Sequence, residues 1–441
     1  RFNFSHSDHS VHKARFETVC KLREELGVNI ATLLDTKGPE VRLKNFKDHK
    51  PVTIKDGDTF TLTTREVEGD ETICSITFPQ LPKDVSVGTR ILINDGNIEL
   101  KALRVDNTDI VCEVIHGGVV SDHKGINVPD VNLSMPYISD ADMSDLEFGA
   151  KMGFDYIAAS FVRTGADVIY LRKFTQSLGW FNPRIIAKIE NAQGVANIDE
   201  ILDAADGIMV ARGDMGVEIP FEQIPAIQKE LIRKAYNAGK NVITATQMLE
   251  SMITNARPTR AEITDVANAI YDGSSAIMLS GETAAGKYPV EAVKTMSLIA
   301  ETTEKDIDYI SRFKKRADER NSSITDAISH ATVTTAHDLN AVAILTVTKG
   351  GTTARTLSKF RPNCPIIALT TDETTYHQLS LSWGIRAGVI EEKTNTDELI
   401  RHALERSVEL GYLKKGDLVV ITAGVPLGMS GTTNLLKVER A

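Results

Sequence analysis

The fold is decided by the stretch Ile185-Ile186-Ala187-Lys188-Ile189-Glu190-Asn191. Its first five residues form a short, almost continuously apolar run, as in a strand that is buried on both faces. Lys188 and Glu190 lie two residues apart, so both side chains point to the same side of that strand. The pattern predicts a buried strand whose carboxyl end presents an ammonium and a carboxylate together.

Further runs of the same kind, each followed by polar residues, occur at residues 1–4, 30–34, 156–159, 207–210, 242–245 and 276–279. Helical spacing of apolar residues separates several of them, at 221–238, 260–271 and 288–301, and Thr259 with Glu262 forms a capping box. Repeated strand–helix units predict a parallel α/β fold, and we interpret the runs as strands of a (β/α)₈ TIM barrel whose first strand precedes residue 1. Polar residues follow the strands, as at the carboxyl face where such barrels hold their active sites.

Two regions depart from this rhythm. Between residues 43 and 137 the apolar period becomes two, and the turns Lys55–Asp58 and Asn94–Asn97 carry the Asp-Gly signal of hairpins. A charged stretch from Arg312 to Arg320 is typical of a connector, and strand-like runs at 341–347, 365–369 and 418–422 follow it. We therefore predict a barrel from residues 1–42 and 138–311, an inserted all-β lid domain at 43–137, and a C-terminal α/β domain at 312–441.

The composition limits the class of protein. The 441 residues are 42% hydrophobic and 25% charged with a net charge of −10, a balance that disfavours nucleic acid and anionic membrane as partners. The sequence has no apolar run of about 18 residues that would span a membrane. Its four cysteines show no metal or C-x-x-C spacing, which indicates reduced thiols and a cytoplasmic location. The opening residues resemble neither a signal peptide nor a natural start, so we expect residues to precede them.

The charged residues at the strand ends predict phosphate and metal chemistry. Glu190 suits a hard cation and Lys188 suits phosphoryl charge, although a structural ion pair in the barrel is the alternative. Asp214, in Arg212-Gly213-Asp214, can complete a Mg²⁺ site with Glu190, and Gly213 lets backbone N–H groups approach an anion. The alternative for Asp214 is a capping residue in a tight turn.

Hydroxyl and polar residues surround these positions in the sequence. Thr246 and Ser280 each follow a strand and can orient a carboxylate or hold a relay water, or they can be ordinary helix N-caps. The residues that could bind a monovalent cation or phosphates after two other strands are Arg1, Asn3, Ser5, His6, Asp35, Thr36 and Arg42. Each of these is weak evidence when taken alone.

In the C-terminal domain, the loop Thr348-Lys349-Gly350-Gly351-Thr352-Thr353 follows a strand and opens a helix. Glycine-rich turns at helix N-termini can bind phosphate, but this loop lacks the Walker pattern. A plain turn is the alternative.

Taken together, these residues and the motifs that contain them resemble the pyruvate kinase family, specifically its bacterial members. The motifs are RFNFSH at 1–6, LDTKGPEVR at 34–42, IIAKIENAQGV at 185–195, ARGDMGVE at 211–218, TATQMLESM at 244–252 and LSGETAAGKYP at 279–289. The resemblance covers essentially the whole chain. It implies transfer of a phosphoryl group from phosphoenolpyruvate to ADP, which gives pyruvate and ATP in glycolysis.

The resemblance also implies site roles. Glu190 and Asp214 would ligate Mg²⁺ (or Mn²⁺), and Lys188 would stabilise the transferring phosphoryl group and the enolate. Arg1 would hold the substrate phosphate, and the Gly213–Asp214 backbone with Thr246 would hold its carboxylate. The K⁺ ligands would be Asn3, Ser5, Asp35 and Thr36, and the nucleotide contacts would be Asn3, Ser5, His6, Arg42 and Lys124. A water held by Thr246 or Ser280 would deliver the final proton.

Several expectations concern regulation and departures from the family. The loop Thr348–Thr353 would bind a phosphorylated allosteric effector, the assembly would be a homotetramer, and the inserted domain would act as a lid. Ser7 stands where a glycine is usual, and Ala285 stands where some members have lysine. The competing interpretation is a Mg²⁺-dependent pyruvate-enolate aldolase or lyase, which the lid and the K⁺ cluster argue against. A catalytically silent effector-binding protein is the third interpretation.

Overall fold

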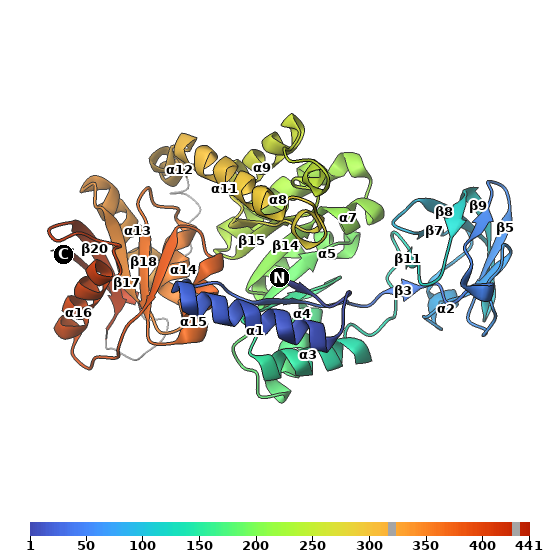
Figure 1. The fold of residues 1–441 in the computed structure, drawn as a ribbon, viewed down its shortest axis with the longest axis horizontal. Coiled ribbons are helices and arrows are strands. Elements are labelled where there is room, and N and C mark those ends of the chain that lie inside the picture. The colour runs from blue at the N-terminus through green and yellow to red at the C-terminus, as the bar shows by residue number, and fades with distance from the viewer. Residues whose placement is uncertain (316–322, 426–432) are drawn as a thin grey trace.

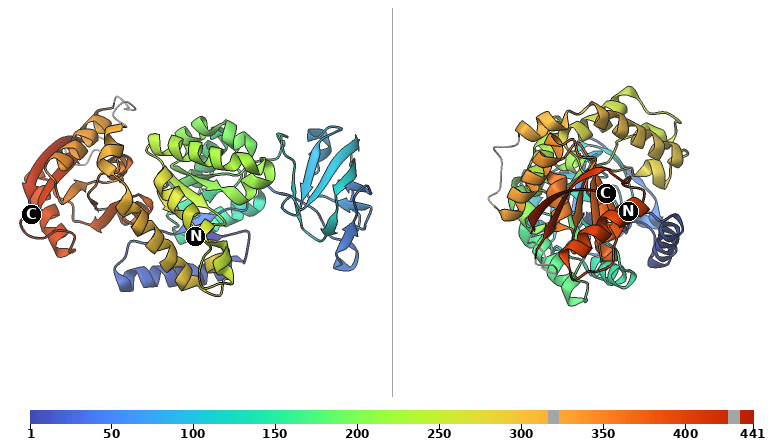
Figure 2. Two further views of the ribbon diagram at one scale, coloured as in Figure 1. Left: turned by 90° about the horizontal axis from the view of Figure 1, so that it is seen from above. Right: turned by 90° about the vertical axis from the view of Figure 1, so that its left-hand side faces the viewer.

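The chain forms three domains in a row, with the barrel in the middle (Figures 1 and 2). The structure is a computed structural model that describes residues 1–315, 323–425 and 433–441. The lid lies at one end of the barrel and the C-terminal domain at the other, and the first residue lies near the middle of the molecule. The lid and the C-terminal domain therefore meet opposite ends of the barrel.

The barrel is a curled sheet of seven parallel strands in the order β1-β2-β12-β13-β14-β15-β16. Their bounds are β1 Phe2–Asn3, β2 Leu33–Asp35, β12 Tyr156–Ala159, β13 Arg184–Ile189, β14 Gly207–Ala211, β15 Asn241–Ala245 and β16 Ala276–Ile277. All seven predicted runs are confirmed as neighbouring strands. β1 and β16 are the two edges of this sheet, and an eighth strand stays a prediction.

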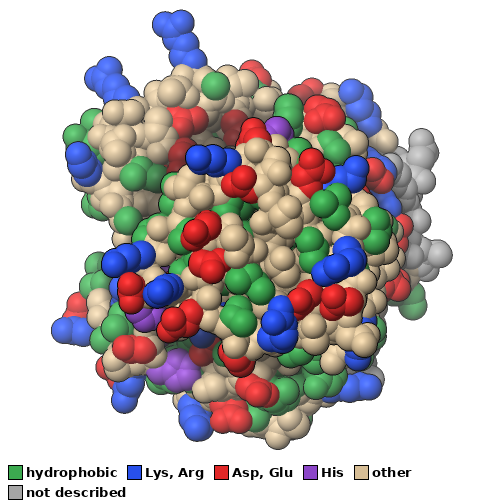
Figure 3. Space-filling model, turned by 90° about the vertical axis from the view of Figure 1, so that its right-hand side faces the viewer, with side chains coloured by type: hydrophobic (Ala, Val, Ile, Leu, Met, Phe, Trp, Pro, Cys, Tyr) green, Lys and Arg blue, Asp and Glu red, His purple; other side chains and the backbone are tan. Residues whose placement is uncertain are grey.

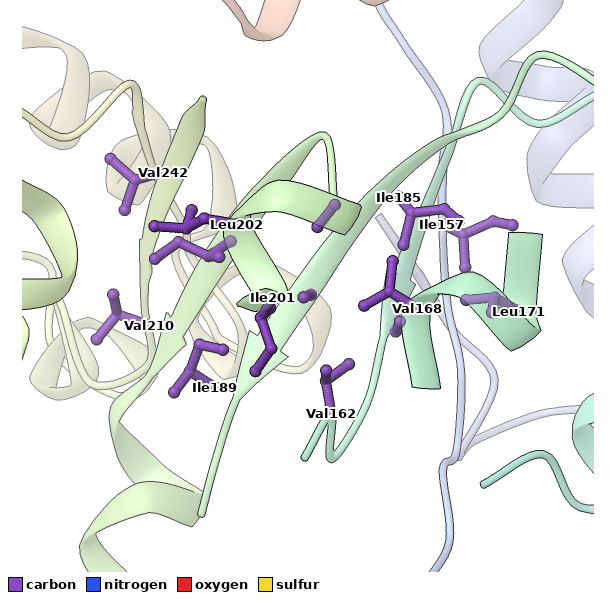
Figure 4. Packing of buried hydrophobic residues seen from close by; sticks show 14 of the residues in the cluster. Ile157, Val162, Val168, Leu171, Ile185, Ile189, Ile201, Leu202, Val210 and Val242 are labelled. Atoms are coloured by element: carbon purple, nitrogen blue, oxygen red, sulfur yellow. The ribbon is translucent and has the colours of Figure 1, made fainter. Parts of the chain in front are cut away.

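Helices cover the outside of the sheet. The helices of this domain are α1 His9–Leu26, α3 Asp140–Met152, α4 Gly165–Ser177, α5 Ala192–Ala196, α6 Ile198–Ala204, α7 Arg212–Glu218, α8 Ile224–Asn237, α9 Arg260–Asp272, α10 Gly281–Ala284 and α11 Pro289–Asp306. The next helix, α12 Tyr309–Lys315, packs its Phe313 into the core of the C-terminal domain. The predicted capping box of Thr259 and Glu262 starts α9. Val168 on α4 and Ile201 on α6 pack against strand residues such as Ile189 (Figure 4), which fixes the strands that carry the site.

The lid is a mostly antiparallel β domain with its own apolar core, and only its β5–β6 pair is parallel among the described strands. Its strands are β3 Val41–Arg42, β4 Val52–Ile54, β5 Thr59–Thr63, β6 Ile73–Ser75, β7 Arg90–Ile93, β8 Ile98–Val105, β9 Asp109–His116, β10 Gly118–Val120 and β11 Gly125–Asn127, with the short helix α2 Leu81–Asp84. The entry strand β3 pairs with the exit strand β11, so the two chain segments that join lid and barrel lie side by side.

One of the two predicted hairpins is confirmed and the other is wrong. Asn94–Asn97 joins β7 and β8, which pair directly. Lys55–Asp58 separates β4 from β5, but β4 pairs with β10 and β5 pairs with β9. This turn packs beside the β9–β10 corner, where the backbone N–H of Gly117 donates to Asp56 Oδ1 at 2.7 Å. The turn chemistry was correct, but longer-range pairing decided the partner strands.

The C-terminal domain is a sheet in the order β19-β18-β17-β20-β21, with only β21 antiparallel. Its elements are α13 Ile324–Asp338, β17 Ala343–Val347, α14 Thr352–Lys359, β18 Ile366–Thr370, α15 Glu373–Gln378, β19 Ile385–Val389, α16 Thr396–Glu409, β20 Leu418–Gly424 and β21 Thr433–Arg440. The predicted strands are confirmed as β17, β18 and β20, while β19 and β21 were not predicted. The predicted connector is helical as far as Lys315, and its remainder lies outside the described residues.

Two further features of the described residues are the charge pattern of the lid-side face and the character of the helices. Acidic and basic side chains are interspersed over the described part of the lid-side face (Figure 3), rather than separated into one basic area. Within the described residues, no helix is both long enough and apolar enough to cross a membrane.

Candidate active site

Lys188 lies at the centre of a charged cluster at the carboxyl ends of the barrel strands. Its Nζ is 3.0 Å from Glu190 Oε1 and 3.2 Å from Asp35 Oδ1, and it donates to Ser160 Oγ at 2.8 Å. These groups follow or end three neighbouring strands, β2, β12 and β13. Burial opposes the charge of Lys188, but Asp35 and Glu190 outweigh it and raise the pKa of Lys188 above its ordinary value. The ammonium is therefore permanently charged.

Glu190 is fully buried, and its two oxygens have different surroundings. Oε2 accepts a hydrogen bond from the backbone N–H of Phe161 at 2.6 Å, whereas Oε1 has no hydrogen-bond donor with good geometry among the described residues. Burial, together with the nearby charge of Asp214, raises the pKa of Glu190 to about 7, although Lys188 opposes this rise. A buried carboxylate oxygen without a hydrogen bond suits a metal ligand.

The described residues fit a Mg²⁺ site that has few protein ligands. In the described part of the chain, no group of three or more His, Cys, Asp or Glu side chains is arranged to hold a metal. Mg²⁺ commonly takes one or two carboxylates and fills its other positions with substrate oxygens and water. Glu190 and Asp214, which line one cleft, fit that donor set.

Asp35 connects Lys188 to the start of the chain. Its Oδ2 is 2.5 Å from Arg1 Nε, and its Oδ1 faces Lys188. Burial works against ionisation of Asp35, but Lys188 and Arg1 hold its pKa below the ordinary value. β1 pairs with β2 so that Asn3 lies opposite Asp35, and the backbone N–H of Ser5 donates to Asn3 Oδ1 at 3.1 Å. Three of the four predicted K⁺ ligands are thus close together.

Thr36, the fourth, has a hydroxyl that is already engaged. Its Oγ1 donates to the Ala158 carbonyl at 3.4 Å and accepts from the backbone N–H of Ser160 at 3.0 Å. The Thr36 carbonyl in turn accepts from Ser160 Oγ at 2.7 Å. This network joins the ends of β2 and β12 rigidly behind Lys188.

Thr246 has an uncommon backbone conformation that fits a functional position. It has φ of 70°, which is costly for a β-branched residue, and Gln247 beside it has φ of 54°. Thr246 Oγ1 accepts from the backbone N–H of Gly213 at 2.9 Å, so the ends of β14 and β15 meet there. Thr246 is therefore not the N-cap that the alternative interpretation required.

Arg212 holds this strained segment in place. Its guanidinium donates to the carbonyl of Thr246 at 2.6 Å and to Asp265 on α9 at 2.7 Å. Asp214 follows in the first turn of α7, and the N-cap residue of that helix is Ala211, so Asp214 is not a capping residue. Arg212 and Ser160 are the supporting residues that sequence reasoning missed. The only sequence signal for these two residues was their position within two residues of the end of a predicted strand.

Among the hydrogen bonds and ion pairs of the described residues, none joins Ser280 to the Lys188 cluster. It precedes α10, but its side chain makes no capping hydrogen bond, and its backbone N–H donates to Glu282 Oε2 at 2.7 Å. The capping alternative therefore does not explain Ser280 either, and its role stays a prediction.

The predicted nucleotide residues share a cavity of about 1170 Å³ between barrel and lid. Its lining includes Arg1, Asn3, Ser5, His6, Arg42, Lys124, Lys188, Glu190 and Asp214. Arg42 is paired with Glu40 at 2.5 Å and donates to the His123 carbonyl at 2.8 Å. Ser7, which stands where a glycine is usual, adopts φ of 68°, so the turn forms with serine in a conformation that glycine adopts more easily.

The C-terminal loop lies where the sequence predicted it, between β17 and α14. Gly351 is the N-cap of α14 with φ of 78°, and its backbone N–H donates to Thr348 Oγ1 at 3.1 Å. The Lys349 carbonyl accepts from Thr370 Oγ1 at 3.2 Å, and Thr353 Oγ1 is 2.7 Å from Thr433 Oγ1. Thr352 is the first residue of the helix. The Gly350 carbonyl accepts from Arg184 Nη2 at 3.3 Å, which connects this loop to the start of β13 in the barrel.

Comparison with known proteins gives a consistent result over the whole chain. Family models described as the pyruvate kinase barrel domain and the pyruvate kinase alpha/beta domain match residues 1–293 and 326–439. The chain is 48% identical to a pyruvate kinase of Clostridium acetobutylicum over 100% of this chain and 93% of that protein. It is 49% identical to one of Geobacillus stearothermophilus, of which it covers 75%. A crystal structure of a pyruvate kinase from Cryptosporidium parvum superposes with a TM-score of 0.93 at 39% identity, covering 99% of this chain and 90% of that one.

Proposed function

This chain belongs to the pyruvate kinase family, and from that premise we propose how its own residues carry out the reaction. It is a pyruvate kinase, which transfers the phosphoryl group of phosphoenolpyruvate to ADP and yields pyruvate and ATP. The observation that best supports our assignment of roles is the buried carboxylate of Glu190. Its Oε1 accepts no hydrogen bond of good geometry and lies beside the charged Lys188.

Lys188 neutralises charge in the reaction. Phosphoryl transfer needs positioning and electrostatic stabilisation more than covalent help from the protein. The Lys188 ammonium is held rigidly by Ser160, Asp35 and Glu190, so it is preorganised toward the transferring group and the developing enolate oxygen. Arg1 supplies the second cation, after exchanging its bond with Asp35 for one with the substrate phosphate.

The ions have separate donor sets. Glu190 and Asp214 are the protein ligands for Mg²⁺ or Mn²⁺, which supplies Lewis-acid stabilisation of phosphate and enolate oxygens when bound. Asn3, Ser5, Asp35 and Thr36 are the proposed K⁺ ligands, because they bring neutral oxygens and one carboxylate together at the ends of β1 and β2.

The substrate carboxylate binds at the junction of β14 and β15. Backbone N–H groups at Gly213 and Asp214 are at the start of α7, and the hydroxyl of Thr246 lies beside them. In the present structure the Gly213 N–H is bonded to Thr246, so the carboxylate takes over this donor when it binds. A water held by Thr246 or Ser280 protonates the enolate, because a threonine hydroxyl is too weak an acid to act alone.

The nucleotide binds under the lid. Asn3, Ser5, His6, Arg42 and Lys124 line the same cavity as Lys188 and Glu190. With the lid closed, ADP is the available phosphoryl acceptor and competing water is excluded. This arrangement separates the chain from an aldolase or lyase, which would need no lid-borne nucleotide site.

We also propose a regulatory site, an assembly and a location. The loop from Thr348 to Thr353, which includes Lys349, Gly350, Gly351 and Thr352, binds a phosphorylated effector at the start of α14. Its contact with Arg184 gives a route to β13, whose other end carries Lys188. The homotetramer and the cytoplasmic location remain predictions from the family resemblance and from the scattered cysteines.

The decisive test is a coupled assay for pyruvate in which ADP, Mg²⁺, K⁺ and sugar phosphates are each omitted in turn. We expect pyruvate formation only with both substrates and Mg²⁺, stimulation by K⁺, and a left-shifted substrate saturation curve with an effector. Pyruvate formed at the same rate without ADP would contradict phosphoryl transfer. Saturation curves unchanged by every candidate effector would contradict the role of the loop alone.

A further inference from the structure

The lid touches the barrel across the cleft through one polar pair that none of the roles above uses. Asn127, at the end of β11 in the lid, donates from Nδ2 to Glu218 Oε1 at 2.9 Å. Glu218 is the last residue of α7 in the barrel, and both side chains line the same cavity as Asp214. The two residues are 91 positions apart in sequence, so the bond forms only when lid and barrel are in this relative position.

A second lid segment lies near this pair. A Cβ added to Gly96, in the β7–β8 hairpin, would lie 3.6 Å from Val217 Cγ1 on α7, so the tip of the hairpin is close to the same helix. The hairpin and the end of β11 therefore rest on the same short helix. Burial raises the pKa of Glu218, and the hydrogen bond from Asn127 opposes that rise, so this bond compensates for part of the cost of burying the carboxylate.

Both partners are attached to elements that carry proposed active-site residues. On α7, Glu218 follows Asp214 by four residues, so the two carboxylates lie on one helical face one turn apart. On the lid, Lys124 directly precedes β11, and Gly125 in that strand pairs with Arg42 in β3. The bond thus ties the strand pair that presents Lys124 and Arg42 to the helix that presents Asp214.

The opposite end of the lid is anchored separately. Arg163 donates to the carbonyls of Leu133 and Met135 at 3.3 and 3.0 Å, and its guanidinium pairs with Asp167 on α4 at 3.0 Å. This fixes the returning segment of the lid to the barrel. A lid held at its return segment and bonded at the end of β11 has one defined position relative to the barrel, whereas the return segment alone would let the lid rotate.

We propose that Asn127 and Glu218 form a latch that sets the closed position of the lid, and that they are positioning residues for phosphoryl transfer to ADP. This inference rests on the proposed function. The latch places Lys124 and Arg42 over the nucleotide at the same time as it seats α7 with Asp214. Neither residue touches the transferring phosphoryl group.

The two side chains allow a matched exchange. Asn127→Asp places two carboxylates against each other, and Glu218→Gln places two amides together with no change of length. The double variant restores one carboxylate and one amide with donor and acceptor reversed. Asn107→Asp, exposed in the turn between β8 and β9 of the lid, and Glu222→Gln, exposed just beyond α7, are the controls.

Steady-state kinetics with both substrates test the latch. We expect Asn127→Asp to lower kcat/KM for ADP at least about tenfold, since like charges oppose closure. The double variant should return to within about threefold of the unmodified chain, and both controls should match it. A double variant as impaired as Asn127→Asp, or an Asn127→Asp variant with full activity, would overturn the latch. If Glu218 were a metal ligand instead, the exchange would not restore activity.

Small-angle X-ray scattering separates this outcome from failure of the proposed function. With Mg²⁺ and phosphoenolpyruvate, the unmodified chain and the double variant should be more compact than Asn127→Asp, and the bond already present without ligands predicts the same order in their absence. An unmodified chain that forms no pyruvate would contradict the function, while the scattering comparison would still decide on the latch. Equal scattering from all variants would refute it, and equal melting temperatures show that the variants are folded.

Discussion

The two ends of strand β13 hold charged clusters made of the same kinds of residues, but the clusters are satisfied to different degrees. At the start of the strand, Arg184 and Arg172 pair with Asp206 at 2.7 and 2.9 Å, and the backbone N–H of Ile185 donates to the same carboxylate at 2.9 Å. At the other end, Glu190 Oε1 accepts no hydrogen bond of good geometry, and its partner is the Lys188 ammonium at 3.0 Å.

The pKa shifts of the two carboxyl groups have opposite signs. Burial acts against ionisation at both, but at Asp206 the two arginines outweigh it and hold the pKa below its ordinary value. At Glu190, burial and Asp214 prevail, and the pKa rises to about 7. A cluster that completes its own hydrogen bonds stabilises the fold, whereas one that remains incomplete is prepared for a ligand. Charge composition alone does not distinguish the two.

The largest expected effect is at Lys188. Lys188→Met should lower kcat by at least about 10³-fold, because it removes a preorganised charge from the transferring group. The fold should be retained, as measured by circular dichroism and by melting temperature. Arg184→Met at the other end of the strand should instead lower the melting temperature and retain most activity. Substantial residual transfer by Lys188→Met would remove the role assigned to Lys188.

Neutralising the acid at each end sharpens the same comparison. Asp206→Asn should destabilise the protein by about 2–4 kcal/mol, since it leaves two arginines without their shared partner. Glu190→Gln should lower Mg²⁺-dependent activity by about 10²-fold, with a much smaller change in stability. Urea unfolding and Mg²⁺-dependent kinetics measure the two quantities. If both variants lost stability equally, the distinction between the ends of β13 would be wrong.

Protonation offers a test without mutation. Because the pKa of Glu190 is raised to about 7, a proton competes with Mg²⁺ for this carboxylate below that pH. The apparent Mg²⁺ affinity should be about tenfold weaker at pH 6 than at pH 8, measured by Mg²⁺ titration of the melting temperature. Without metal, the folding stability should depend on pH in the opposite direction. Folding raises the pKa of Glu190, so the stability that its neutral form provides is lost as the pH rises toward 7. A Mg²⁺ affinity independent of pH would contradict Glu190 as the ligand.

The smallest expected effect concerns the strained backbone at the mouth. Thr246→Ala and Thr246→Gly both remove the hydroxyl, so each should lower kcat by about tenfold. Glycine adopts φ of 70° without strain, so Thr246→Gly should be more stable than Thr246→Ala by about 1 kcal/mol. Chemical denaturation of the two variants measures this difference. Equal stabilities would mean that the conformation stores no strain.

Much of the barrel could be predicted because local signals and tertiary structure agree there. The run at residues 185–189 is apolar on both faces and became β13, and Thr259 with Glu262 starts α9 as predicted. In the lid, the turn Lys55–Asp58 had the correct chemistry, but its flanking strands pair with β10 and β9. Pairing between strands that lie 46 to 68 residues apart in sequence is a tertiary property that a turn motif does not determine.

At the site, spacing predicted that Lys188 and Glu190 share a side, and the structure confirms it. Spacing could not predict that Ser160 and Asp35 contact Lys188, because these two residues lie at the ends of other strands, β12 and β2. The strain at Thr246 and its support by Arg212 were equally invisible, since φ is not encoded by one residue type. The Asn127–Glu218 bond depends on the placement of two domains.

The pairing of β3 with β11 has a consequence for how the chain folds. The lid is inserted between β2 and β12. If the lid stayed unfolded, these two strands could pair only by closing a long loop. Its entry and exit strands are hydrogen-bonded neighbours, with Gly125 opposite Arg42, and the domain has its own core. Once the lid has folded by itself, the barrel has only a short effective loop to close, and the entropy of closure depends on that shorter length. The insertion can therefore lengthen the chain greatly while slowing nucleation of the barrel very little.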